Sequence, residues 1–176
     1  DEGYITVSLY NPRDYTSDKH RRVDNKPYGG GPGMVLEAEP ILKAVKAAVG
    51  RKKNVKICTM SRAGKTLNNA YARKVVKKHT HVALICGHYE GIDARVEKIL
   101  KAEPLSIGPY VLTGGELPAM VVADVMSRQI EGVLGNVDSL EDERDAGAEV
   151  YTRPEVMQIQ GKKYKVPKVL LSGHHK

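Results

Sequence analysis

The chain has 176 residues, enough for one domain with a hydrophobic core and too few for two full-sized domains. Its formal net charge of +7 favours a polyanionic partner such as nucleic acid, although a lysine-rich surface without such a partner explains the charge equally well. Cys58 and Cys86 lie in apolar runs and form no C-x-x-C pair, which predicts a reduced, cytoplasmic protein. We find no signal peptide and no apolar run near the roughly 18 residues that span a bilayer.

Predicted strands and helices alternate along the chain. The strands are expected at 4–10, 54–60, 81–86 and 106–112, and the helices at 37–49, 65–79, 93–101 and 116–130. Residues 11–34 are polar and rich in glycine, which predicts a long loop, and the chain after 130 is predicted to be loop-rich up to a last apolar run at 166–171. This alternation predicts an α/β domain with a mostly parallel sheet flanked by helices.

Two glycine-bearing junctions follow two of these strands. The first, ALICGHYEGID (83–93), contains Gly87 and Gly91, and the second, SIGPYVLTGGELPAM (106–120), contains Gly114 and Gly115. Glycine lets the backbone approach a ligand closely because it has no Cβ, and Pro118 suits the first turn of the following helix. We therefore predict one pocket with a main-chain floor at the ends of neighbouring strands.

Three other motifs have ordinary explanations. The segment 63–66, AGKT, lacks the preceding glycine of a phosphate-binding P-loop, and a helix start explains it better. The segment 28–34, YGGGPGM, fails the dinucleotide-binding pattern and suits a flexible turn. His174 and His175 have no partner at metal-ligand spacing, so no metal ligand is assigned.

Basic side chains are concentrated in the loop at 13–26, where tyrosines are interleaved with them. Such a loop suits phosphate contacts and base stacking, and a solvated loop is an equal alternative. Arg128 lies near the end of the apolar helix at 116–130. It either matches the helix dipole or presents a guanidinium fork to a pocket.

Eight motifs in series resemble the bacterial tRNA (guanine-N1)-methyltransferases, which belong to the SPOUT class of knotted methyltransferases. They are NPRDYTSDKHRRVD, PYGGGPGM, CGHYEGID, SIGPYVLTGGELPAM, SR at 127–128, GVLGN, YTRPEV and VPKVLLSGHH. The resemblance implies a single SPOUT domain over 1–176 with a deep trefoil knot at about 82–120, a fold that composition would not have revealed. It also implies S-adenosylmethionine as methyl donor, tRNA as substrate, a homodimer with the site at the interface, and assistance by Mg²⁺.

The same resemblance assigns roles to particular residues. His20, Arg21 and Asp24 match the part of the family that meets the substrate, and Arg128 matches the arginine that holds the target guanine. The cofactor pocket falls on Met60, Ser61, Gly87, Tyr89, Glu90, Gly91, Ile107, Gly108, Pro109, Tyr110, Val111, Leu112, Gly114, Gly115 and Pro118.

The reaction needs a base because N1 of guanine carries a proton at neutral pH. In the family this base is an Asp of a D-S-F segment that follows GVLGN. Here Asp138, which precedes Ser139 and Leu140, is the preferred equivalent, while an ungapped count places Glu143, beside Asp142, at that position. A solvated acidic loop at 138–145 is the ordinary explanation for most of these carboxylates.

The chain also departs from the family. The segment 59–64, TMSRAG, replaces the usual L-S-P-Q-G, and Pro109 replaces an Asp. The family's first strand and helix and its helical C-terminal tRNA-binding domain are expected to be absent. Two alternatives therefore stay open: a knotted cofactor- or RNA-binding module with little turnover, and a SPOUT enzyme that methylates another RNA atom, such as a ribose 2′-hydroxyl.

Overall fold

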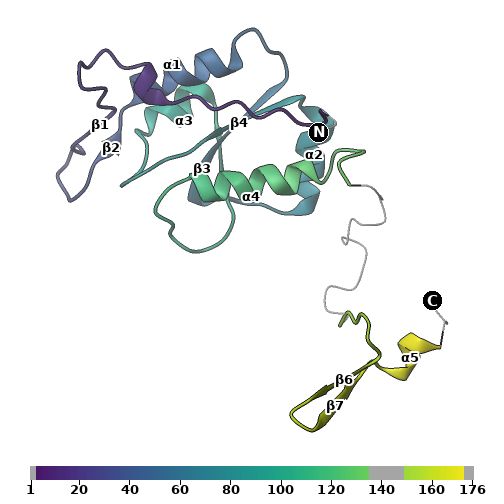
Figure 1. The fold of residues 1–176 in the computed structure, drawn as a ribbon. Helices are drawn as coiled ribbons and strands as arrows, with labels where there is room; N and C mark the ends of the chain where they lie inside the picture. Colours follow the sequence, from purple (N-terminus) through teal and green to yellow (C-terminus); the bar gives the residue numbers. More distant parts are fainter. Residues whose placement is uncertain (1–2, 135–148, 173–176) are drawn as a thin grey trace. The chain divides into compact units, whose positions relative to one another are not determined.

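The computed structural model describes residues 3–134 and 149–172 (Figure 1). The contacts between Cα atoms divide the chain into two compact units, Asp1–Leu140 and Glu141–Lys176, and each is described by itself. Within the described residues, no helix is long and apolar enough to cross a membrane.

The first unit is built on a three-stranded parallel sheet with the order β4-β3-β5. The central strand β3 (Val55–Thr66) pairs with β4 (His81–Ile85) on one side and β5 (Glu103–Ser106) on the other. The mostly parallel α/β sheet predicted from the sequence is therefore confirmed. The two strands that precede the glycine junctions are β4 and β5, and they are separated by β3, so the expectation that they are neighbours is wrong.

Helices cover both faces of this sheet (Figure 1). α1 (Ala38–Val49) and α3 (Arg95–Leu100) contribute to one core cluster, which includes Ile41, Val96 and Ile85. α2 (Asn69–Lys78) and α4 (Glu116–Ser127) contribute to the other, which includes Val75, Val122 and Leu105. Neighbouring residues of one strand point to opposite faces, and accordingly Leu84 packs against the α2–α4 cluster while Ile85 belongs to the α1–α3 cluster.

The segment before α1 is mostly irregular. It contains a 3₁₀ helix, η1 (Pro12–Asp14), and two short antiparallel strands, β1 (Asp24–Asn25) and β2 (Val35–Leu36). The predicted strand at 4–10 is wrong, because these residues are extended but pair with no strand among the described residues. Val7 and Leu9 are 73% and 92% exposed, and β propensity without a pairing edge does not make a strand.

Three predicted boundaries move for identifiable reasons. β3 continues to Thr66 by shifting its register with β5 between Met60 and Lys65, so α2 begins only at Asn69. Asn68 caps this helix, its side chain accepting from the Tyr71 amide at 2.8 Å. The predicted strand at 106–112 is wrong: β5 ends at Ser106, whose hydroxyl bonds to the next turn instead.

The second unit contains a hairpin and a short helix. β6 (Val156–Ile159) pairs antiparallel with β7 (Lys162–Lys165) through Gln160 and Gly161, which both have positive φ as a tight two-residue hairpin turn requires. The apolar run at the end of this unit forms α5 (Lys168–Leu171). The hairpin departs from the loop-rich prediction for this region. Both of its strands are exposed throughout, and β7 is lysine-rich, so the sequence shows no alternation of buried and exposed residues that would predict strands.

Candidate functional site

A cavity of about 180 Å³ lies at the carboxyl ends of β4 and β5. Fourteen of the fifteen residues that the family resemblance assigns to the cofactor line it, and Pro109 does not. It also has five lining residues that sequence reasoning did not name: Arg62, His88, Leu105, Ser106 and Thr113. Both glycine junctions thus meet at one cavity although their strands are not neighbours.

A direct main-chain contact holds the two glycine junctions together. The Gly115 amide donates to the Gly87 carbonyl at 2.8 Å, and His88 forms an isolated antiparallel bridge with Gly114. A Cβ added at Gly115 would stand 2.7 Å from Cys86 Cα and 2.8 Å from the Gly87 nitrogen. Real Cβ atoms essentially never approach backbone so closely, so position 115 requires glycine.

Ionisable side chains surround this contact. His88 Nδ1 lies 3.9 Å from a carboxylate oxygen of Glu116, the first residue of α4, and the His88 ring meets the Tyr89 ring edge-on at 4.7 Å. Burial, and secondarily the Glu116 carboxylate, raises the pKa of the Cys86 thiol. Cys86, which precedes the lining residue Gly87, is therefore protonated at neutral pH and no nucleophile.

Ser106 shapes the second junction. It is 5% exposed, and its hydroxyl accepts from the Gly108 amide at 3.2 Å and donates to the Gly108 carbonyl at 3.1 Å. These bonds turn the chain away from β5 into the loop that lines the cavity. Tyr110 adds a bond from its hydroxyl to the Ile107 carbonyl at 3.2 Å.

The glycine-rich segment before β2 supports the first junction. The Glu90 amide donates to the Met34 carbonyl at 3.1 Å, and the Leu36 amide donates to the Gly91 carbonyl at 2.9 Å. A Cβ at Gly33, where φ is +80°, would come within 2.5 Å of the Glu90 carboxylate. The end of the segment YGGGPGM, Gly33 and Met34, therefore packs on the cavity loop, which its composition did not predict.

Main-chain hydrogen-bonding groups remain free at the cavity. Within the part of the chain that the structure describes, the amides and carbonyls of Val111 and Leu112 make no hydrogen bond, although both residues line the cavity. A Cβ at Gly91 would meet no atom within 4 Å, so there is space beside this glycine, although its amide and carbonyl are bonded to His88 and Leu36. The free groups of Val111 and Leu112 suit a ligand that is recognised by its polar edges through backbone, such as an adenine ring.

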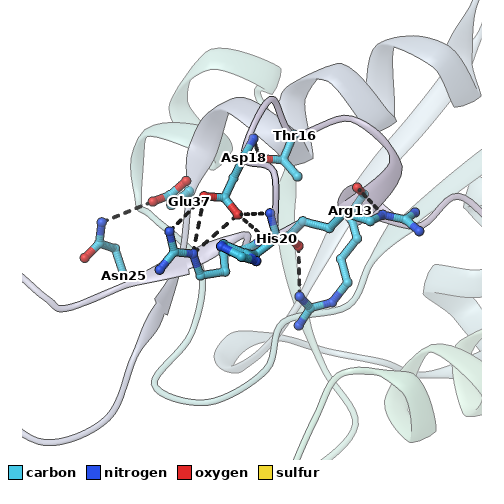
Figure 2. Close-up of polar contacts among 8 residues, drawn as sticks. Arg13, Thr16, Asp18, His20, Asn25 and Glu37 are labelled. Carbon is cyan, nitrogen blue, oxygen red and sulfur yellow. Dashed lines mark hydrogen bonds and ion pairs between the residues drawn. The ribbon is translucent and has the colours of Figure 1, made fainter.

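The basic loop has its own hydrogen-bond network (Figure 2). Asp18 accepts from the His20 amide at 2.8 Å and from the Arg22 guanidinium at 2.9 Å. The bond from Arg22 holds the pKa of Asp18 well below its usual range. Arg21, which has a φ of +57°, pairs with Asp14 and donates to the Arg13 carbonyl at 3.2 Å.

The predicted substrate residues do not line the cavity of this chain. His20 and Arg21 lie in the basic loop, and Asp24 lies in β1. Arg128 follows the last residue of α4, and its amide donates to the Asp124 carbonyl at 3.0 Å. A helix rises about 1.5 Å per residue, so Arg128 is about 18 Å along α4 from its start at the cavity.

The predicted base positions Asp138, Asp142 and Glu143 lie outside the described residues, as do His174 and His175. Among the residues that are described, no group of three or more His, Cys, Asp and Glu side chains could hold a metal ion.

The five lining residues that sequence reasoning missed differ in whether the sequence could have revealed them. His88 and Thr113 lie inside the two quoted junction motifs, so reading every residue of each junction would have found them. Ser106 was placed in the predicted strand at 106–112, and Leu105 directly precedes that strand. Arg62 was found only by the structure, because it lies in the part of β3, between Met60 and Lys65, where the register with β5 shifts.

With this geometry established, comparison with known proteins is decisive. The model of one protein family, described as tRNA (Guanine-1)-methyltransferase TrmD, matches residues 1–176. The chain belongs to this family. The resemblance inferred from the eight motifs is thereby confirmed.

Curated relatives agree with this assignment, and each of the following is named tRNA (guanine-N(1)-)-methyltransferase. The chain is 46% identical to the protein of Dictyoglomus turgidum over 99% of its own length and 70% of the relative. It is 48% identical to that of Thermomicrobium roseum over 98% of its length and 64% of the relative. It is 45% identical to that of Carboxydothermus hydrogenoformans over all of its length and 68% of the relative. The chain thus spans about two thirds of the relatives it matches.

Proposed function

We propose that the chain is an S-adenosylmethionine-dependent methyltransferase domain that modifies N1 of the guanosine immediately 3′ of the tRNA anticodon (position 37). Membership of the TrmD family over the whole chain supports this proposal most strongly. The target base must leave its stack to be reached. Since tRNA is a cytoplasmic substrate, the proposed activity places the protein in the cytoplasm.

The cavity fits the proposed methyl donor. Its two junctions approach closely at Gly115, which has no Cβ, and the cavity is lined by Val111 and Leu112, whose main-chain groups form no hydrogen bond within the described residues. When bound, S-adenosylmethionine supplies a methyl group on a positively charged sulfur. In this proposal the residues of the chain orient that group and exclude water, and no side chain forms a covalent bond with it.

The guanine requires a separate set of groups. The proposed base, Asp138 with Glu143 and Asp142 as alternatives, removes the N1 proton, and Arg128 stabilises the charge that develops on O6. His20, Arg21 and Asp24 are proposed to contact the tRNA around the target. Mg²⁺ is implied by the family, but we derive no step through it because the described residues offer no cluster of ligands.

A homodimer would complete the site. Arg128 lies about 18 Å along α4 from the cavity of its own chain, so its proposed role is more readily met at the cavity of a second copy. Exposed apolar side chains near the cavity also support association: Leu117, Met120 and Val111 are 62%, 67% and 76% exposed. Leu117 and Met120 lie one turn apart on α4, and exposed apolar surface is typical of an interface.

The proposal includes the family's trefoil knot at about 82–120 within one methyltransferase domain. The close approach of Gly115 to Cys86 and Gly87 supports it, because it brings both ends of this segment together.

The test is transfer of labelled methyl to tRNA transcripts that carry guanosine or adenosine at position 37. Label that depends on guanosine is the expected result. Absence of label on either transcript, with intact cofactor binding, would favour a binding module. Label that is insensitive to the base would favour methylation of another RNA atom.

A further inference from the structure

The positive charge of the chain is concentrated in one segment. The fifty residues from Pro40 to Tyr89 contain no Asp or Glu and twelve Lys and Arg. The whole chain has 28 basic and 21 acidic residues, so the remainder carries 16 basic against 21 acidic residues. The net charge of +7 therefore originates entirely from this segment.

The fold gathers part of this charge at one edge of the sheet. β3 and β4 begin side by side, with Val55 opposite His81, and His79 Nδ1 lies 3.3 Å from the Asn54 carbonyl. The turn before β3 and the end of α2 are therefore adjacent. The name basic edge is used here for the exposed side chains of Arg51, Lys52, Lys53, Arg73, Lys74, Lys77 and Lys78.

The three lysines of α2 in the basic edge are uncompensated within the described residues. Lys74, Lys77 and Lys78 form no ion pair with any residue in the described ranges, and they line an open depression with Arg73 around Ala70. The dipole of α2 favours cations only in its last turn, which accounts for Lys77 and Lys78. It does not account for Lys74 or for the three basic residues before β3.

We infer that the basic edge binds the phosphate backbone of the RNA substrate, at the opposite end of the sheet from the cavity. It contains no aromatic side chain, so it suits phosphates better than unstacked bases. Val55 and Met60 are separated by about 17 Å of strand at about 3.3 Å per residue. A ligand that spans both sites must be longer than that, which fits a folded RNA and excludes a mononucleotide.

This inference rests on the proposed function in taking that RNA to be tRNA. The test compares the unmodified chain with the triple variant Lys74→Gln, Lys77→Gln and Lys78→Gln. Binding is measured over a salt series to transcripts with guanosine or with adenosine at position 37, the second of which the proposed reaction does not methylate. Loss of three phosphate contacts should reduce the slope of log K against log salt by about 2 to 3 and weaken binding at least about tenfold at 0.1 M salt.

Two control variants separate charge from structure. Replacement of the same three lysines by arginine keeps the charge and should retain the slope and the affinity. Lys43→Gln with Lys98→Gln removes two charges from α1 and α3, on the other face of the sheet, and should leave the slope nearly unchanged. The KM for tRNA should rise in the glutamine triple variant, while the affinity for S-adenosylmethionine and the kcat at saturating tRNA stay unchanged.

Several results would overturn the inference. They are an unchanged slope in the glutamine triple variant, an equal change per charge in the α1–α3 control, and lysine-dependent binding to anionic lipid vesicles but not to RNA. Methylation with an unchanged slope would leave the proposed function standing and remove only the basic edge. Lysine-dependent RNA binding without methylation would leave the basic edge standing and remove only the proposed function.

Discussion

Replacement of Gly115 by alanine tests the contact that joins the two glycine junctions. The φ of Gly115 is −81°, which alanine adopts readily, so the expected effect is steric. The new Cβ would stand 2.7 Å from Cys86 Cα and 2.8 Å from the Gly87 nitrogen, both of them backbone atoms that no rotamer change can move. Ordinary carbon contacts are about 3.5 to 4.0 Å, so the junctions must separate by about 1 Å.

This separation should reduce both cofactor affinity and stability. Overpacking of this kind costs about 1 to 3 kcal/mol, which corresponds to a fall in Tm of about 2 to 12 °C at this chain length. A misplacement of about 1 Å in a binding site costs up to about 100-fold, so we expect affinity for S-adenosylmethionine to fall by about 10- to 100-fold. Calorimetry and thermal unfolding measure the two effects.

Gly87→Ala is the matched control within the same cavity. Its Cβ would meet only the flexible Ile92 side chain, at 3.2 Å and beyond, so the protein itself can accommodate it and only a small change in Tm is expected. The steric reasoning would be refuted if Gly115→Ala bound the cofactor within twofold of the unmodified chain at an unchanged Tm. It would also be refuted if the two alanine variants lost Tm equally.

Three further predictions follow from single residues. Ser106→Ala should lower cofactor affinity several-fold and stability by about 1 to 3 kcal/mol, because Gly108 loses its buried partner; calorimetry and thermal melts check this, and full retention of both would contradict it. Arg128→Ala should abolish methyl transfer with little loss of cofactor affinity; an equal loss of both would assign the residue a structural role. The hydrogen bond from Arg22 lowers the pKa of Asp18, so its stabilisation is complete above the ordinary Asp pKa and disappears as pH falls through the lowered value. Carboxyl NMR should therefore show Asp18 ionised down to pH values below about 3.9, and a titration near that ordinary value would contradict the contact.

The sequence was sufficient to predict those helices and strands whose hydrophobic pattern depends only on neighbouring residues. The helix at 37–49 and the strand at 81–86 were found to within one residue, because helical spacing and a short apolar run reflect burial directly. The strand predicted at 4–10 was wrong because β propensity does not show whether a pairing partner exists. The predicted strand at 106–112 was wrong because the chain turns at Ser106, whose hydroxyl accepts a hydrogen bond from the Gly108 amide. The sequence does not show that a serine in an apolar run will form such a bond.

For the cavity too, local features could be predicted from the sequence and long-range features could not. Glycine at strand ends predicted that the two junctions would share one pocket, and fourteen of the fifteen residues assigned by the family resemblance line it. The order β4-β3-β5 is a long-range property, so the sequence did not reveal that β3 separates the two junctions or that Arg62 reaches the cavity. The support of Glu90 by Met34 was equally hidden, since those residues are remote in sequence.

The most direct measurement follows the glycine amides while the demethylated cofactor, S-adenosylhomocysteine, is added. The chain has 17 glycines, and isotopically labelled glycine would give NMR signals from both junctions and from distant turns. We predict saturable shifts at Gly87, Gly91, Gly114 and Gly115, with Gly50 and Gly161 unaffected. Shifts confined to one junction, or found mainly at the distant turns, would contradict the claim that the two glycine junctions hold the methyl donor together.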